Sequence, residues 1–150
     1  MQTKTVPFPS AALAYEKYGD VEVSLVIEMG FGASMAEWRQ LTAKLAGRYT
    51  VLLYQRAGYG ASSTSTLERT PENIAAELYL LLQQVGHARK VTVLAHSQGG
   101  LYAWKFAKLY PELVDRLVYL LCGRGSVKDG KHGQAARDRL QPGQSIRCAD

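Results

Sequence analysis

Cysteine and histidine are scarce in this chain of 150 residues, which has two of the former and three of the latter. Cys122 and Cys148 cannot form a disulfide framework or a metal site. Cys122 ends an apolar run, where a free thiol behaves as a small core residue. The glycine-rich loop at 58–60 lacks the lysine of a phosphate-binding loop. The sequence therefore predicts neither a metal nor any other cofactor.

Long apolar runs are also lacking. The longest, Leu117–Cys122, has six residues, whereas a membrane span needs about 20. Residues 1–8 lack an apolar segment long enough for a signal peptide, so we expect none there. Residues 1–122 carry 12 basic and 10 acidic residues, and residues 123–150 carry 6 and 3. No basic stripe with interleaved aromatics crosses the first segment, which argues against nucleic-acid binding. We expect a cytoplasmic protein that binds neither membrane nor nucleic acid.

What the sequence does contain is a regular alternation of short apolar runs and amphipathic segments. The runs predict an edge strand at 13–18 and buried strands at 25–29, 49–54, 90–95 and 116–121. The segments predict helices at 36–45, 71–85 and 98–110. In the second helix, Thr70 is the expected N-cap and Pro71 the first residue. Such alternation predicts an α/β fold, a doubly wound and mostly parallel sheet covered on both faces.

The segment Ala95-His96-Ser97-Gln98-Gly99-Gly100 joins the strand at 90–95 directly to a helix. A serine among small residues at such a junction is typical of a nucleophile elbow, a turn that raises the hydroxyl above the carboxyl edge of a sheet. Small neighbours are needed because the turn crowds the backbone. Ser97 is therefore the candidate nucleophile for attack on an ester or a related acyl bond.

The oxyanion that forms in such an attack needs preorganised N–H donors. The amide of Gln98, at the positive end of a helix, is one candidate. The loop Gly30-Phe31-Gly32 follows the strand at 25–29, and there the amide of Phe31 is the second candidate. Glu28 ends the same strand and is either half buried or near the site.

A serine nucleophile also needs a histidine base held by a carboxylate. His96 should leave the opposite side of the turn from Ser97 and have a structural role, and His87 reads as a surface residue in a loop. His132 and Asp129 complete the chain order Ser, Asp, His. Three residues cannot, however, reach from two separate strand ends, so we assign neither a base nor an acid.

Three motifs together resemble the α/β-hydrolase superfamily, in its serine esterase and lipase-like branch. Segment 28–38 is similar to the oxyanion loop, which is usually His-Gly-x-Gly followed by Trp. Segment 54–62 is similar to the Asp-Arg-x-Gly-x-Gly-x-Ser turn, and segment 95–100 to Gly-His-Ser-x-Gly-Gly. The resemblance runs from about residue 6 to residue 121 and covers only the N-terminal half of such a domain.

The chain departs from these motifs in three places. Met29 stands where the superfamily usually has His, Gln55 where it has Asp, and Ala95 where it has Gly. None of these changes excludes activity. The resemblance implies that the catalytic acid and histidine follow later strands, beyond residue 150. We therefore expect a sheet truncated after the strand that follows the nucleophile helix, and a function impaired by an incomplete triad.

Composition divides the chain at residue 122. Residues 1–122 form the predicted half-domain, whereas residues 123–150, which contain no aromatic residue, are predicted to be a basic, disordered tail. Without later strands, Arg116–Leu121 would be an exposed edge that favours self-association. If the site is active, its expected partner is a small-molecule acyl substrate. The alternative is a non-catalytic interaction module or truncated pseudo-enzyme.

Overall fold

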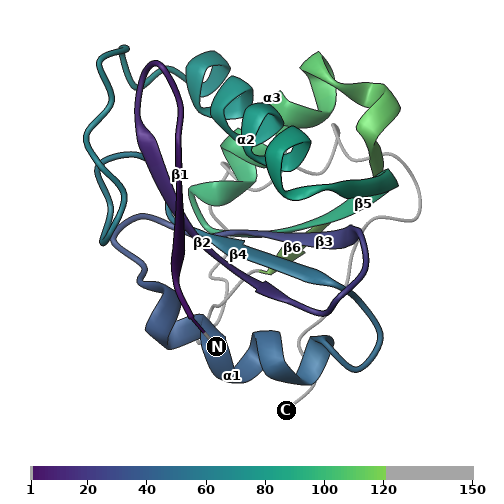
Figure 1. The fold of residues 1–150 in the computed structure, drawn as a ribbon. Helices are drawn as coiled ribbons and strands as arrows, with labels where there is room; N and C mark the ends of the chain where they lie inside the picture. The colour runs from purple at the N-terminus through teal and green to yellow at the C-terminus, as the bar shows by residue number, and fades with distance from the viewer. Residues whose placement is uncertain (1, 121–150) are drawn as a thin grey trace, which may run out of the picture.

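The computed structural model of the chain describes residues 2–120, which build one sheet with helices on both faces (Figure 1). The strands are β1 (Lys4–Pro7), β2 (Ala12–Tyr18), β3 (Val23–Glu28), β4 (Val51–Tyr54), β5 (His87–His96) and β6 (Val114–Leu120). The helices are α1 (Met35–Leu45), α2 (Pro71–Val85), α3 (Gly99–Leu109) and the short 3-10 helix η1 (Pro111–Leu113).

The strands lie in the order β1-β2-β4-β3-β5-β6. The four strands β3 to β6 run parallel, and β1 and β2 are antiparallel to their neighbours. Ile27 of β3 pairs with Leu53 on one side and Leu94 on the other. These central strands are nearly continuous apolar runs because helices cover both of their faces. The expected doubly wound, mostly parallel α/β sheet is therefore confirmed.

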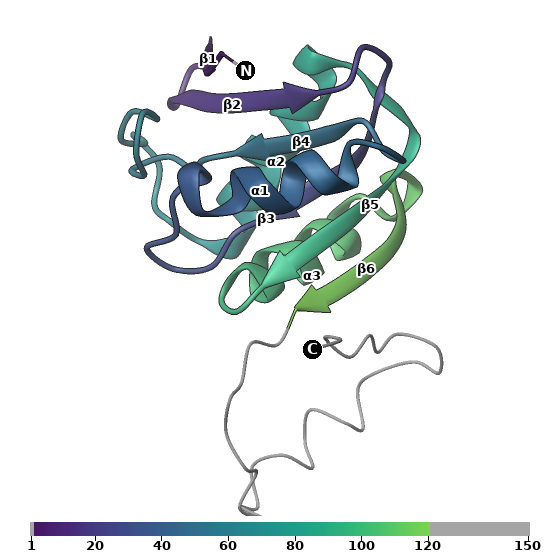
Figure 2. The same cartoon turned by 90° about the horizontal axis from the view of Figure 1, so that it is seen from below.

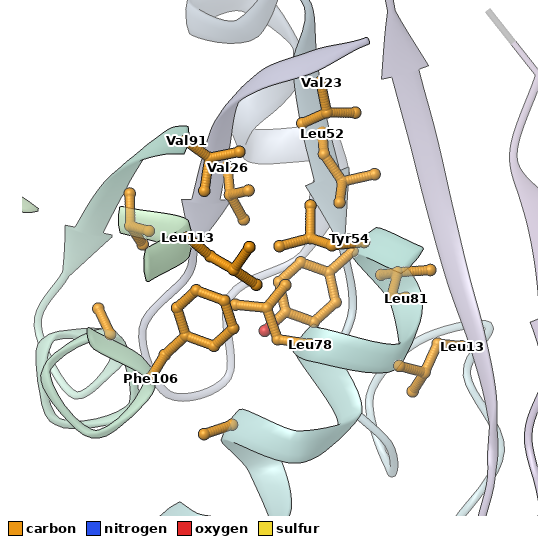
Figure 3. Close-up of a cluster of buried hydrophobic side chains, with 14 of the residues drawn as sticks. Leu13, Val23, Val26, Leu52, Tyr54, Leu78, Leu81, Val91, Phe106 and Leu113 are labelled. Carbon is orange, nitrogen blue, oxygen red and sulfur yellow. The ribbon is translucent and has the colours of Figure 1, made fainter. Parts of the chain in front are cut away.

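Two apolar layers hold the helices to the sheet. Figure 2 views the sheet from the α1 side, where Met35 packs with buried strand residues such as Ile27 and Leu53. On the other face, α2 and α3 pack over a larger cluster, in which Leu78 and Phe106 lie close together between the helices and the strands (Figure 3). Both layers are built from side chains far apart in sequence, so they form only when the sheet does.

The first strands differ from the sequence prediction. β2 is not an edge strand, because it pairs with β1 on one side and β4 on the other. The prediction failed for two reasons. The outer strand, Lys4–Pro7, is only four residues long and ends in proline, so it gives no strand pattern. Glu16 in β2 is fully buried although it is charged, and a charge at such a position suggests a solvent-facing edge.

The starts of β5 and β6 also differ from the sequence prediction. His87 is the first residue of β5, where it pairs with Val23, and not part of a loop. Its ring lies within hydrogen-bond distance of Gln83 and of the Ala88 carbonyl. β6 begins at Val114, two residues before the expected start. The expected last residue of that strand, Leu121, lies outside the described residues.

The ends of α2 follow the sequence prediction closely. The Thr70 hydroxyl accepts a hydrogen bond from the Asn73 amide at 3.2 Å, and Pro71 occupies the first turn. Gly86 ends the helix with φ +78°, a conformation that favours glycine. Of the helices in residues 2–120, none has the length and apolar character needed to cross a membrane.

Candidate active site

Ser97 sits at the turn between the end of β5 and the start of α3. Its φ is +51°, and within residues 2–120 it is the one non-glycine residue with a positive φ. A left-handed conformation costs a non-glycine residue about 1–3 kcal/mol, so it persists only where the surroundings impose it. The residue is also exposed. This strained, exposed strand-to-helix turn is the backbone that a nucleophile elbow requires.

The turn at residues 97–100, the candidate elbow, packs tightly against the end of β3 and the loop after it. A Cβ added to Gly99 would lie 2.3 Å from the Glu28 carbonyl oxygen and 2.7 Å from that of Met29. A Cβ on Gly30 would lie 3.2 Å from the Cβ of Ser97. The glycines therefore let the loop after β3 and the first turn of α3 touch, which places Gly30 beside Ser97.

The two predicted oxyanion donors lie on either side of this contact. In the first turn of α3, the Gly100 amide donates to Ser97 O and the Leu101 amide to Gln98 O. The Gln98 amide precedes these bonds, where a helix leaves its N–H groups without an intrahelical acceptor. Phe31 follows Gly30, and its side chain is 78% exposed. The roles of both amides stay predictions.

Beneath the loop lies a buried group of three polar side chains. Glu28 is 1% exposed, Tyr54 2% and Arg56 5%. The Tyr54 hydroxyl donates to Glu28 Oε2, and Arg56 Nη1 donates to Glu28 Oε1 at 2.6 Å. Burial raises the pKa of Glu28, although Arg56 and Tyr54 favour its charged form. Burial, together with the Glu28 charge, also raises the pKa of Tyr54. Glu28 is thus fully buried rather than half buried.

Sequence reasoning missed the role of Arg56. The matched Asp-Arg-x-Gly motif placed this arginine in a turn but gave it no partner. In the structure it binds Glu28 and the carbonyl oxygens of Met29 and Gly30. The sequence does contain a signal for this ion pair: a glutamate ends one apolar strand, and an arginine comes shortly after another. Neighbouring parallel strands bring their carboxyl ends together, so the two side chains can meet.

No histidine of residues 2–120 makes a hydrogen bond to the Ser97 side chain. The His96 ring contacts Trp38 of α1 edge-on, with centroids 5.4 Å apart, so it lies on the face opposite α3, as expected. Its Nδ1 is buried and has no hydrogen-bond partner among the described residues. His87 lies at the opposite end of β5 from His96, where it pairs with Val23, whereas Ala95 pairs with Glu28 at the site end. His132 and Asp129 lie outside the described residues.

The described residues also offer no cluster of three or more His, Cys, Asp or Glu side chains that could hold a metal ion. Glu28, the acidic residue beside the site, forms an ion pair with Arg56 instead. What the arrangement offers chemically is an exposed hydroxyl on a strained turn, beside a glycine loop and a helix N-terminus.

Comparison with known proteins identifies the family. A family model described as the alpha/beta hydrolase fold matches residues 23–137, more than half of the chain. The chain belongs to the alpha/beta hydrolase family. The resemblance drawn from the three motifs is thereby confirmed. The match extends past residue 122, where composition changes, and the division of the chain at that residue stays a prediction.

Individual relatives agree with this assignment. An uncharacterized protein of Mycobacterium tuberculosis is 34% identical over 106 residues, which are 71% of this chain and 30% of that protein. A soluble epoxide hydrolase of a Corynebacterium species is 32% identical over 106 residues, 71% of this chain and 37% of its own length. The solved structure of a Vigna radiata epoxide hydrolase mutant superposes with a TM-score of 0.71 at 21% identity, covering 79% and 37% of the two chains. The chain thus spans about a third of the length of these three proteins.

Proposed function

We propose that this chain carries the nucleophile and the oxyanion hole of a serine hydrolase that acts on an ester or a related acyl bond. The observation that carries the proposal is the backbone of Ser97, held at φ +51° between a parallel strand and a helix. Strain of this kind clusters at functional sites because it costs stability wherever it has no use. Membership of the alpha/beta hydrolase family supports hydrolysis as the reaction class.

The proposed reaction has two steps. Ser97 Oγ attacks the carbonyl carbon of the ester and loses its proton, and the carbonyl oxygen takes up the negative charge beside the Gln98 and Phe31 amides. The bond to the alcohol then breaks, the alcohol leaves with a proton, and an acyl-serine remains. Water hydrolyses this ester in the second step and restores the hydroxyl.

Both proton transfers need a base. Because no histidine of residues 2–120 hydrogen-bonds to the Ser97 side chain, we place the base and its carboxylate outside the described part of the chain. Serine hydrolases that lose a triad member retain about 10³–10⁴-fold catalysis over water, from the oxyanion hole and binding. Because that residual catalysis does not require the serine, we expect weak turnover from this chain on its own, and only the part of it that depends on Ser97 identifies the nucleophile.

The test is hydrolysis of p-nitrophenyl acetate and butyrate by the purified chain, together with labelling by a fluorophosphonate probe and mapping of the labelled residue. Ser97→Ala is the test variant. Ser34→Ala, which removes a part-exposed hydroxyl that donates to Glu37, is the matched control. Turnover and labelling that disappear only in Ser97→Ala support the proposal. A wild-type chain that is neither labelled nor faster than Ser97→Ala overturns it.

The alternative function is a non-catalytic interaction module that pairs through β6. Within residues 2–120, β6 pairs with β5 alone, and an unpaired strand edge is a template for association. We propose that two copies self-associate along this edge. Sedimentation or light scattering across a hundredfold range of concentration tests this: a concentration-dependent dimer supports it, and a monomer throughout overturns it.

A further inference from the structure

One guanidinium group contacts three consecutive residues of the candidate oxyanion loop. Arg56 Nη1 donates to Glu28 Oε1 and to the Met29 carbonyl oxygen, and Nη2 donates to the Gly30 carbonyl oxygen at 3.1 Å. The arginine lies two residues after the end of β4, and its side chain is 5% exposed. This buried arginine donates hydrogen bonds to two backbone carbonyls as well as to the Glu28 carboxylate. These bonds fix the path of that stretch of backbone.

The same group contacts two further parts of the site. The guanidinium carbon lies 5.0 Å from the ring centroid of Tyr59 and 4.8 Å from that of Tyr102. Tyr102 belongs to α3, the helix that begins just after Ser97. The Tyr59 ring meets the Phe31 ring edge-on, with centroids 6.4 Å apart. Arg56 therefore links the loop after β3, the turn after β4 and the helix of the elbow.

Because the peptide bond is planar, these contacts also set the direction of the candidate oxyanion donor, the Phe31 N–H. In a trans peptide unit the C=O and the N–H are coplanar and point in opposite directions. The Gly30 carbonyl and the Phe31 N–H belong to one such unit. A donor that holds the Gly30 oxygen therefore aims the Phe31 N–H to the opposite side. Holding the Met29 oxygen fixes the Gly30 N–H in the same way.

Without a donor to the Gly30 carbonyl, few other contacts fix the backbone conformation of residues 30–32. Gly30 and Gly32 flank Phe31, and Gly32 has φ +69°, so the backbone on both sides can rotate at little steric cost. The Phe31 side chain is largely exposed and contributes little packing. The direction of the Phe31 N–H then depends on what binds the carbonyl in front of it.

We propose that Arg56 is a positioning residue that aims the Phe31 N–H at the oxyanion of the Ser97 reaction by holding the Gly30 carbonyl. Glu28, with its second oxygen bonded to Tyr54, holds the guanidinium in place for this task. Lysine cannot replace the arginine, because a single ammonium does not reproduce a planar fork that binds a carboxylate and two carbonyls at once. The inference rests on the proposed function, since it assigns a role within that site.

The test compares Arg56→Lys with a matched control, Arg69→Lys. Arg69 binds the buried carboxylate of Glu77 through both of its terminal nitrogens, at 2.6 and 2.9 Å, but makes no contact with the loop. Each variant is measured in two ways. Hydrogen–deuterium exchange reports on the amides of residues 29–32, and fluorophosphonate labelling at Ser97 gives the maximal rate and the half-saturating concentration separately.

For Arg56→Lys we expect exchange at residues 29–32 to rise about 10-fold or more, with α2 unchanged. The maximal labelling rate should fall about 10- to 100-fold, since removal of a whole oxyanion donor costs about 10²–10³. The half-saturating concentration should change little, because the N–H acts on the charge that develops during attack. Arg69→Lys should leave both measurements at the wild-type values.

Each outcome decides the inference. Unchanged exchange at residues 29–32 in Arg56→Lys overturns it, and so does raised exchange with an unchanged labelling rate. If the wild type is not labelled at all, the proposed function fails, and the exchange measurement alone decides whether Arg56 holds the loop. If Arg56→Lys does not fold, the double variant Glu28→Gln/Arg56→Gln replaces it, because that pair leaves no buried charge unpaired, and the same expectations apply.

Discussion

The contact between Gly99 and the end of β3 gives a sharp test of how the elbow is built. In Gly99→Ala the new methyl group would lie 2.3 Å and 2.7 Å from two carbonyl oxygens, those of Glu28 and Met29. Both oxygens are backbone atoms at the end of a central strand, so neither can turn aside as a side chain would. The first turn of α3 must move off the sheet, or the loop after β3 must yield.

The size of the effect follows from overpacking. Forcing an extra carbon into a well-packed contact costs about 1–3 kcal/mol, and here the clash is at its most severe because both neighbours are rigid. Alanine recovers up to about 1 kcal/mol of helix propensity over glycine. We expect Gly99→Ala to lower the free energy of unfolding by about 2 kcal/mol.

Gly100→Ala is the matched control, one residue further along the same helix. Its new methyl group meets only the ring of Tyr119, at 3.1 Å, and a ring can shift by the few tenths of an ångström required. We expect its stability to remain within about 1 kcal/mol of wild type. Urea melts followed by far-UV circular dichroism measure both variants. A Gly99→Ala midpoint equal to that of wild type, or equal losses in the two variants, would refute the close approach of elbow and loop.

Three further predictions concern the scaffold, and urea melts measure each of them. A hydrogen bond from Arg39 lowers the pKa of Glu16 from 4.5 to about 2, so this carboxylate stabilises the fold above pH 4.5 and the gain is lost as the pH falls toward 2. Glu16→Gln should remove that pH dependence, which we put at about 1–2 kcal/mol because the half-exposed Arg39 is screened by solvent; a profile identical to wild type would contradict the pairing. Phe106→Ala should cost about 3–5 kcal/mol and Leu109→Ala, on the exposed side of α3, far less; equal costs would contradict the core assignment. Thr70→Ala should cost about 1 kcal/mol through loss of the N-cap, and no change would mean that the Asn73 amide finds another acceptor.

The parts of the fold that could be predicted are those whose signal is local. The apolar runs that became β3, β4 and β5 are buried on both faces, so composition alone marks them. The limits of α2 depend on Thr70, Pro71 and Gly86, which act within one turn. β2 was misplaced because its neighbour β1 gives no pattern and because Glu16 is neutralised by Arg39, an ion pair across 23 residues that no local pattern contains.

The candidate site likewise has local features, which could be predicted, and contacts between distant residues, which could not. The place of Ser97 at a strand-to-helix turn could be predicted, because a serine between a strand and a helix, among small residues, is a local feature. Its contact with Gly30 and the role of Arg56 could not, because they depend on which strands become neighbours. The order β4-β3-β5 brings the ends of three strands together, and only then does an arginine after β4 reach the loop after β3.

This strand order also separates the proposed chemistry into two parts with different structural requirements. Attack and oxyanion stabilisation involve Ser97, Gln98 and Phe31, which follow the adjacent strands β5 and β3, and the arginine that holds the loop follows β4. Proton transfer requires a histidine, and in residues 2–120 none hydrogen-bonds to the side chain of Ser97. Under this proposal, the first part is assembled wherever these three strands pair, whether or not the second is present. Labelling at Ser97 would then be slower than with a complete triad, whereas the orientation of the loop would depend on Arg56, and for this reason exchange at residues 29–32 and labelling at Ser97 must be measured separately.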